Sequence, residues 1–375
     1  MELIIFDRIR NRALTFFDEF VVEMKYDSIA STFRFSFLFN PLNPEHKEFA
    51  CVSHFHIATL KHEGEVILTG YILSQHFDDE PEKQMVHISG YSLPGVLEDC
   101  EIYPSPPVSL KDIAFSWSPD LDVKYGGGYP LQSDGLSLRE IAQKYLSPFG
   151  IKMVVDSSVS DSMDEKYDET TAKATQSLKS YLCELASQRN IVITHDEFGR
   201  LVFTRPSSTR TPIAHFERGS SLFTKMSLVF DGKNMHSNIM VLQQQDEDPE
   251  IPSNENETIN PYVPFVFRPR VIVQNSGDAN ETSNTGKNIR ADELRNMKLT
   301  IDIAKWEIGK KIIRPGNIIT VTNPYVYLYK KSKWFVESVT LKGNPKSLTA
   351  AMECVIPECY TGEEPVYIFK GINLH

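Results

Sequence analysis

Apolar and polar residues alternate through much of the first hundred positions of the chain. In residues 33–37, FRFSF, phenylalanine fills every second position, which is the period of a half-buried β-strand. Three further stretches are apolar or alternating at similar spacing: 55–59, 66–73 and 86–90. Several short strands of this kind, separated by polar turns, predict a small β-barrel or β-sandwich over residues 1–100.

The hydrophobic period lengthens to that of a helix in the middle of the chain. Ser137 and Glu140 have the spacing of a capping box, in which each side chain bonds the backbone N–H of the other residue. Two apolar stripes at helical spacing follow, at Leu138, Ile141, Ala142, Tyr145 and Leu146, and at Leu178, Tyr181, Leu182, Leu185 and Ala186. The glycine of Asp196–Gly199 then marks a hairpin turn. These signals predict an α/β module that, with a proline-rich connecting segment before it, spans residues 101–205.

The second half of the chain returns to strand-like patterns, interrupted by polar segments. Residues 246–260 hold six acidic and no basic residues, and 275–290 are rich in Asn, Ser, Thr and Gly, so both are predicted to be polar, partly disordered loops. An apolar strand, Tyr262–Val273, is predicted between them. We expect 206–290 to be a β-rich segment with long polar loops and 291–375 to be a second small β-barrel with a tail. The predicted fold class is mainly β with an α/β insertion, in several domains.

Length and charge narrow the choice of function. A chain of 375 residues is too long for one ordinary core, which agrees with a multidomain protein. The formal net charge of -11 makes the surface repel phosphate. Tight nucleic-acid binding is therefore disfavoured, although nucleic acid can pass the protein without being held.

Cysteine spacing and the N-terminal segment indicate where the protein is made. The five cysteines match no disulfide framework and no zinc motif, so we expect them to be reduced, as in a cytoplasm. The first residues, MELIIFDRIRNR, have too short an apolar stretch for a signal peptide, and their basic residues follow it. No apolar run is long enough to span a membrane.

Motifs of catalysis are absent or incomplete. The sequence has no phosphate-binding loop, no dinucleotide fingerprint and no HExxH. Residues 90–95, GYSLPG, differ from a nucleophile elbow by one extra residue, which favours a strand end with a turn. Glu98 and Asp99 would point to opposite faces of an extended segment, so they do not form an acid–base pair. Cys354 and Cys359 are too far apart for a redox pair and are interpreted as strand-end cysteines.

Other polar clusters have a structural interpretation beside a functional one. His54 and His56 would share one strand face and His62 lies nearby, but no acid or cysteine at a fitting spacing completes a metal site. The acid-rich stretch Asp156–Asp168 lacks the order of a calcium loop, and the loop 246–260 either faces solvent or binds a basic partner. Two glycosylation sequons, at Asn256 and Asn280, are chance matches without a secretory signal. We therefore predict no catalytic, cofactor-binding or metal-binding residues, and a structural protein.

Several short segments, in this order, resemble a known family. They are 28–37, 66–72, 86–92, 97–100, 137–150, 178–205, Arg268–Pro269, Arg290–Asp292 and Arg314–Asn317. Together they resemble the baseplate hub proteins of contractile-tailed, Mu-like phages and, more distantly, the hub part of type VI secretion spikes. The chain departs from that pattern at Tyr91, where the family has arginine, and lacks the tryptophan that often precedes the Pro-Gly turn.

The resemblance implies two tail-tube-like β-barrels per chain and a homotrimer. Three chains would then give a ring of six barrels, matching a sixfold tail tube to a threefold central spike. The implied partners are the tube protein, the spike protein, the baseplate wedge proteins and the tape-measure protein, with DNA only passing through the channel. The implied location is the tail baseplate of a virion, assembled in the host bacterial cytoplasm, and no enzyme activity is implied.

Two other functions compete with the hub interpretation. A tail-associated cell-wall hydrolase would need two facing carboxylates, and the sequence offers no convincing pair. A carbohydrate-binding or receptor-binding tail module would show surface clusters of tryptophan or tyrosine. The three tryptophans, Trp117, Trp306 and Trp334, are dispersed along the sequence instead.

Overall fold

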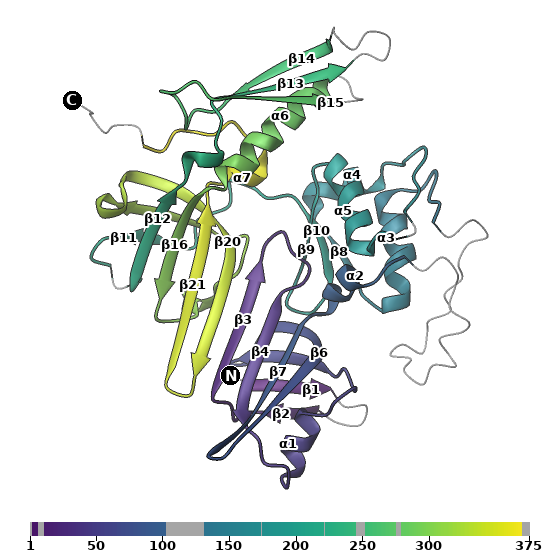
Figure 1. Ribbon diagram of the computed structural model, residues 1–375, viewed down its shortest axis with the longest axis vertical. Coiled ribbons are helices and arrows are strands. Elements are labelled where there is room, and N and C mark those ends of the chain that lie inside the picture. The colour runs from purple at the N-terminus through teal and green to yellow at the C-terminus, as the bar shows by residue number, and fades with distance from the viewer. Residues whose placement is uncertain are drawn as a thin grey trace. The chain divides into compact units, whose positions relative to one another are not determined.

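The chain forms two compact units (Figure 1). The computed structural model describes residues 2–6, 11–102, 131–173, 175–220, 222–244, 252–274 and 279–369. The first unit comprises Met1–Arg205 and Thr340–Ser347, and the second comprises Pro206–Val339 and Leu348–His375. Most of the predicted proline-rich connection, from residue 103 onward, and Trp117 lie outside the described residues.

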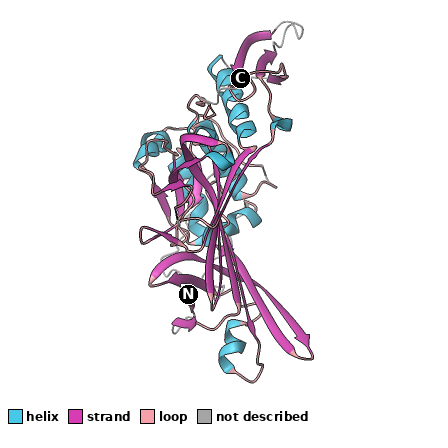
Figure 2. Cartoon of the chain, turned by 90° about the vertical axis from the view of Figure 1, so that its left-hand side faces the viewer, coloured by secondary structure: helices cyan, strands magenta, loops and turns pink. Residues whose placement is uncertain are grey.

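Strands make up most of the regular structure, as the colouring of Figure 2 shows. The predicted fold class, mainly β with an α/β insertion, is confirmed. Among the helices of the described ranges, none is long and apolar enough to cross a membrane.

Seven antiparallel strands form the sheet of the first unit, in the order β3-β4-β7-β6-β5-β1-β2. They are β1 (Glu2–Phe6), β2 (Asn11–Leu14), β3 (Glu19–Lys25), β4 (Thr32–Leu38), β5 (Ile57–His62), β6 (Glu65–Glu80) and β7 (Lys83–Ser92). A short helix, α1 (Pro44–Phe49), follows β4. The predicted alternation in β4 is confirmed, because Phe33, Phe35 and Phe37 are all buried. Phe20 on β3 stacks on Phe35, so the aromatic face of two neighbouring strands forms one core.

Two glycines allow β6 and β7 to approach very closely. Gly70 pairs with Ser92, Tyr71 with Tyr91, and Ile72 with Gly90. A Cβ atom at Gly70 would overlap the backbone carbonyl of Tyr91, and one at Gly90 would overlap the carbonyl of Tyr71. The register shifts at the next position, which indicates a local irregularity where the strand pair bends.

The α/β module of the first unit has the predicted elements. Helices α3 (Leu138–Leu146) and α5 (Leu178–Gln188) bury both apolar stripes in one core with a three-stranded sheet, β8 (Met153–Val155), β10 (Leu201–Thr204) and β9 (Val192–His195). The capping box is confirmed, since Glu140 N donates to Ser137 Oγ and Ser137 N donates to Glu140 Oε2 at 2.8 Å. Short helices accompany them: α2 (Val96–Asp99) and α4 (Ser160–Asp164).

The main sheet of the second unit has the order β12-β16-β21-β20-β19-β11. Its strands are β11 (His215–Glu217), β12 (Lys225–Phe230), β16 (Met297–Ile303), β19 (Ile318–Asn323), β20 (Leu328–Asn344) and β21 (Ser347–Val355). A two-stranded hairpin, β17 (Glu307–Ile308) and β18 (Lys311–Ile312), and the helix α7 (Glu358–Thr361) complete this part. Trp306 and Trp334 are both buried in the core.

The predicted small barrels are not closed in the described residues, where their sheets are open. Closing a barrel requires backbone hydrogen bonds between the first and last strands of a sheet. Within the described ranges, β2 does not pair with β3 in the first unit, and β11 does not pair with β12 in the second. Alternation predicted the strands and their buried faces, but it contains no information about closure.

The polar segments of the second unit are partly regular, which the sequence did not predict. Residues 252–259 form β14 (Pro252–Ile259), which pairs with β13 (Asn238–Gln244), and β13 pairs with β15 (Pro269–Gln274). The predicted strand Tyr262–Val273 is therefore wrong in its first half, which is a loop. From residue 279 onward, helix α6 (Ala279–Leu294) takes the place of the second predicted loop, and it packs on β13 and β14 (Figure 1). Residues 246–251 and 275–278 of the two predicted loops lie outside the described residues. The buried face of α6 consists of Thr282, Gly286, Arg290, Glu293 and Leu294. These buried positions are three to four residues apart, as in a helix, but most of them are not apolar, so the sequence shows no apolar stripe.

A buried carboxylate fixes α6 to the strands. Glu293 is 4% exposed and accepts hydrogen bonds from His236 N at 2.8 Å, from His236 Nδ1 at 2.7 Å and from Arg270 Nη1 at 3.0 Å. His236 precedes β13 and Arg270 lies on β15, so one carboxylate joins three elements. Loss of such an acceptor leaves several donors unsatisfied, which costs more than an exposed ion pair.

We predict that Gly90→Ala destabilises the protein by about 2 kcal/mol or more, because the added methyl group meets backbone that cannot move independently. Gly232→Ala is the matched control, since its Cβ would meet only the Phe230 ring at 3.6 Å. Urea unfolding of both variants measures the difference. Equal midpoints for the two variants would contradict the close approach of β6 and β7.

We also predict that Glu293→Ala lowers the free energy of unfolding by about 2–3 kcal/mol. Glu353→Ala is the control, because Glu353 is half exposed and pairs with Lys298 at 3.6 Å, an arrangement that contributes about 0.5 kcal/mol or less. Denaturant titration of the two variants is the measurement. A loss no larger at Glu293 than at Glu353 would show that the buried carboxylate does not hold α6 in place.

Candidate functional site

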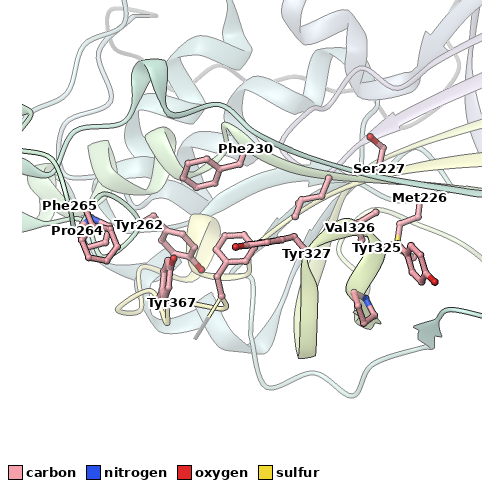
Figure 3. A pocket seen from close by; sticks show the side chains of 13 residues that line it. Met226, Ser227, Phe230, Tyr262, Pro264, Phe265, Tyr325, Val326, Tyr327 and Tyr367 are labelled. Carbon is pink, nitrogen blue, oxygen red and sulfur yellow. The ribbon is translucent and has the colours of Figure 1, made fainter. Parts of the chain in front are cut away.

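An open groove of about 710 Å³ in the second unit gathers most of its exposed aromatic residues. Four segments far apart in sequence line it: β12, the loop after β14, the 3₁₀ turn η5 (Pro324–Val326) with Tyr327, and the segment after α7. The aromatic lining residues, called here the tyrosine groove, are Phe230, Tyr262, Phe265, Tyr325, Tyr327, Tyr367 and Phe369. Figure 3 shows them in succession from Phe265 at one end to Tyr325 and Met226 at the other.

A buried asparagine positions the end of the groove formed by η5. Asn323 is 3% exposed, and its Oδ1 accepts a hydrogen bond from Tyr325 N at 3.1 Å, which caps the turn. Tyr327 then adopts a left-handed conformation with φ 64°, so the chain reverses directly after the turn. The two tyrosines of this turn are thereby presented at the surface by a fixed backbone.

A second anchor holds the segment after α7 against the groove. Asn260 Oδ1 accepts from Tyr262 N at 3.0 Å, and Tyr262 OH donates to Val366 O at 2.8 Å. The Tyr262 ring contacts Tyr367 and Phe369 at centroid distances of 5.3 and 6.1 Å. Burial raises the pKa of Tyr262 above its ordinary value, so the hydroxyl stays protonated and able to donate.

The two ends of the groove are strongly exposed. Phe265 is 90% and Tyr325 75% accessible, which is unusual for large aromatic side chains. At the Tyr325 end, the guanidinium of Arg218 lies 3.6 Å from the ring centroid, in a cation–π contact. Arg218 forms no ion pair with a carboxylate in the part of the chain that the structure describes.

The serine of the elbow-like segment has a structural role. Ser92, at the end of β7, is fully buried; its Oγ donates to Ile29 O at 2.6 Å and accepts from Ser31 N at 3.1 Å. Both bonds join β7 to the residues before β4. Within the described residues, no histidine lies within hydrogen-bond distance of the Ser92 hydroxyl. The hydroxyl therefore has no base that would activate it as a nucleophile.

The carboxylates considered as catalytic candidates each bind a different structural partner. Glu98 forms an ion pair with Lys179 at 2.9 Å, whereas Asp99 accepts a hydrogen bond from Tyr91 OH at 2.7 Å. In the Asp156–Asp168 stretch, Asp156 caps a 3₁₀ turn by accepting from Ser158 N, and Asp164 pairs with Arg139. The pKa of Asp164 is lowered chiefly by its hydrogen bond to Arg139. Through these contacts the carboxylates stabilise the fold.

The histidine cluster contains a cysteine that the sequence reasoning left out. Cys51 Sγ lies 2.9 Å from His54 Nδ1, and the rings of His54 and His56 stack at 5.4 Å, while His62 is buried on β5. A thiol and two imidazoles are zinc-type ligands. His54 Nδ1 also lies 3.0 Å from Val52 O; since a carbonyl only accepts, a hydrogen bond there requires the proton on Nδ1 and leaves Nε2, 3.7 Å from Cys51 Sγ, as the ring nitrogen open to a metal.

The remaining candidates lie outside the groove. Cys354 and Cys359 are both free and buried, and burial raises the pKa of each thiol, which makes them inert. Asn256 lies on β14 and Asn280 on α6. The tyrosine groove itself was missed because its members are spread from Phe230 to Phe369 without any period, and only the packing of four segments brings them together.

We predict that Tyr262→Phe loosens the segment after α7 without unfolding the protein. The ring contacts remain, but Val366 O loses its donor, at a cost of about 1 kcal/mol. Amide hydrogen exchange over 366–369 should become several-fold faster. Tyr329→Phe is the control, since Tyr329 is half exposed and its hydroxyl makes no hydrogen bond within the described residues; equal exchange in both variants would refute the anchor.

No family profile matches the sequence, and no curated protein matches it either. Solved structures do match over nearly the whole chain. A 43 kDa tail protein of prophage MuSo2 from Shewanella oneidensis is 17% identical with a TM-score of 0.76, covering 96% of this chain and 99% of the other. A tail protein from Neisseria meningitidis is 15% identical with a TM-score of 0.73, covering 96% and 98%.

Secretion-system proteins show the same likeness at a greater distance. An Escherichia coli component of the type VI secretion system, described as structurally similar to T4 bacteriophage tail proteins, is 9% identical with a TM-score of 0.52, covering 98% of this chain and 80% of the other. The predicted resemblance is thus confirmed at the level of fold. The chain therefore has the fold of these phage tail proteins.

Proposed function

We propose that this protein is a structural subunit of a tail baseplate, acting as the hub of a contractile phage tail or a related injection device. The observation that carries the proposal is the fold likeness to Mu-like tail proteins, which covers almost all of both chains. A likeness of this extent includes both units of the chain.

The arrangement of sheets supports a ring. Each unit contains one large, mainly antiparallel sheet, so three chains would contribute six such sheets. Such a trimer would offer sixfold repetition to a tail tube and threefold repetition to a central spike. Its partners in this proposal are the tube, spike, wedge and tape-measure proteins, and its location is the virion baseplate after assembly in the bacterial cytoplasm.

The charge of the protein suits a channel for DNA. A net charge of -11 gives weak attraction to phosphate, so DNA would pass through the ring without being held. We propose that the acidic residues face the lumen of this ring. A structure of the assembled ring with a neutral or basic lumen would contradict this part of the proposal.

The proposal includes no enzymatic role. The serine, carboxylate and cysteine groups weighed as catalytic residues are buried, ion-paired or hydrogen-bonded in ways that hold the fold together. A peptidoglycan-degradation assay with the purified protein tests this directly. Clearing of the substrate would favour the cell-wall hydrolase alternative.

We predict that the purified protein has a native mass near three times 42.7 kDa, about 128 kDa, by mass photometry or light scattering. The trimer should persist on dilution if it resembles an obligate ring. A monomer at every concentration, even after mixing with the purified tube and spike proteins, would overturn the hub assignment.

A further inference from the structure

The tyrosine groove runs beside a strand edge that no other strand covers. β12 pairs only with β16, in antiparallel register from Lys225 with Asp302 to Phe230 with Met297. Within the described ranges no strand pairs with its other side. β12 has the sequence KMSLVF, without proline or a bulge, and Val229 and Phe230 are exposed. Natural sheets usually cover or interrupt an apolar edge of this kind.

The residues of β12 whose backbone groups are left unpaired also line the groove. Asp231 N donates to Asn296 O, which fixes the alternation of the ladder between β12 and β16. In an antiparallel pair, successive residues direct their N–H and C=O groups alternately toward and away from the partner. Met226, Leu228 and Phe230 therefore direct theirs away from β16, and all three also line the groove.

The groove provides apolar sites along this edge and a charge at one end. Aromatic rings extend from Phe265 to Tyr325 (Figure 3), so side chains on alternate positions of a docked strand would meet aromatic surfaces. At the Tyr325 end, Arg218 is an exposed cation without a carboxylate partner among the described residues. A carboxylate placed there would form an ion pair and leave the cation–π contact in place.

We propose that an extended segment of another protein adds as a strand to the free edge of β12. Its backbone would bond Met226, Leu228 and Phe230, its alternate apolar or aromatic side chains would enter the tyrosine groove, and an acidic residue would pair with Arg218. A glycan fits these observations less well, because sugars stack on an open ring face and that of Tyr325 carries Arg218. The inference does not depend on the hub role.

A set of labelled peptides in solution tests the proposal. The probes are labelled twelve-residue peptides with Val, Phe or Tyr at alternate positions, Thr or Ser between them, and Asp or Asn at one end. Binding to the full-length protein is measured by fluorescence anisotropy. We expect Asp-ended peptides to bind more tightly than Asn-ended ones, and N-methylation of alternate residues to abolish binding, because it removes backbone donors.

Variants of the protein locate the binding. Tyr325→Ala, at a side chain too exposed to affect folding, should weaken binding at least tenfold, and Arg218→Gln should remove the preference for Asp. Leu42→Ala is the control, because Leu42 is an 85% exposed apolar residue of the other unit and its loss should change nothing.

Three results would overturn the proposal. The first is that no peptide binds the wild-type protein, or that N-methylation leaves binding unchanged. The second is binding on a glycan array that Tyr325→Ala removes while no peptide binds, which would assign the groove to a sugar. The third is that Tyr325→Ala lowers the native mass of the protein, which would show that a second copy of this chain occupies the groove.

Discussion

The close approach of β6 and β7 at Gly70 and Gly90 is the constraint on which the first sheet depends. Each glycine lies against the carbonyl of a tyrosine on the other strand, and these tyrosines face each other between them. No side chain fits at either position, so the two strands can pair this closely only with glycine there. β4 pairs with β7, and β5 pairs with β6, so both neighbouring strands are aligned on this central pair. Phe35 of β4 then stacks on Phe20 of β3.

The second unit relies on buried polar groups to hold apolar residues at its surface. Exposed aromatic rings gain nothing from burial, so hydrophobic collapse alone would not keep them in place. Asn323 caps the turn that carries Tyr325, and the Tyr262 hydroxyl ties down the segment that carries Tyr367. Polar anchors of this kind have strict geometry, and they therefore give the groove a defined shape. A surface that is both apolar and rigid is suited to binding, since little order has to be imposed on it.

At 17% identity most residues differ between this chain and the prophage tail protein, although the fold is alike. Alternation, helix caps and turn glycines specify strands, helix starts and hairpins without requiring particular residues. The capping box at Ser137 and the turn at Asp196–Gly199 are local signals of this kind, and both are present in the structure. Side chains at surfaces are under no such constraint, so the fold says little about the tyrosine groove.

The sequence by itself determined the elements whose signals are local: the phenylalanine strand β4, helices α3 and α5 with their buried faces, and the β9–β10 hairpin. It also determined the mainly β class, because alternation is a property of neighbouring residues. Tertiary structure alone decided that the sheets stay open and that α6 is a helix although its buried face carries Thr282, Gly286 and Arg290. It also decided that tyrosines from four distant segments share one groove. These features depend on which surfaces meet in space, and pairing between distant segments leaves no period in the sequence.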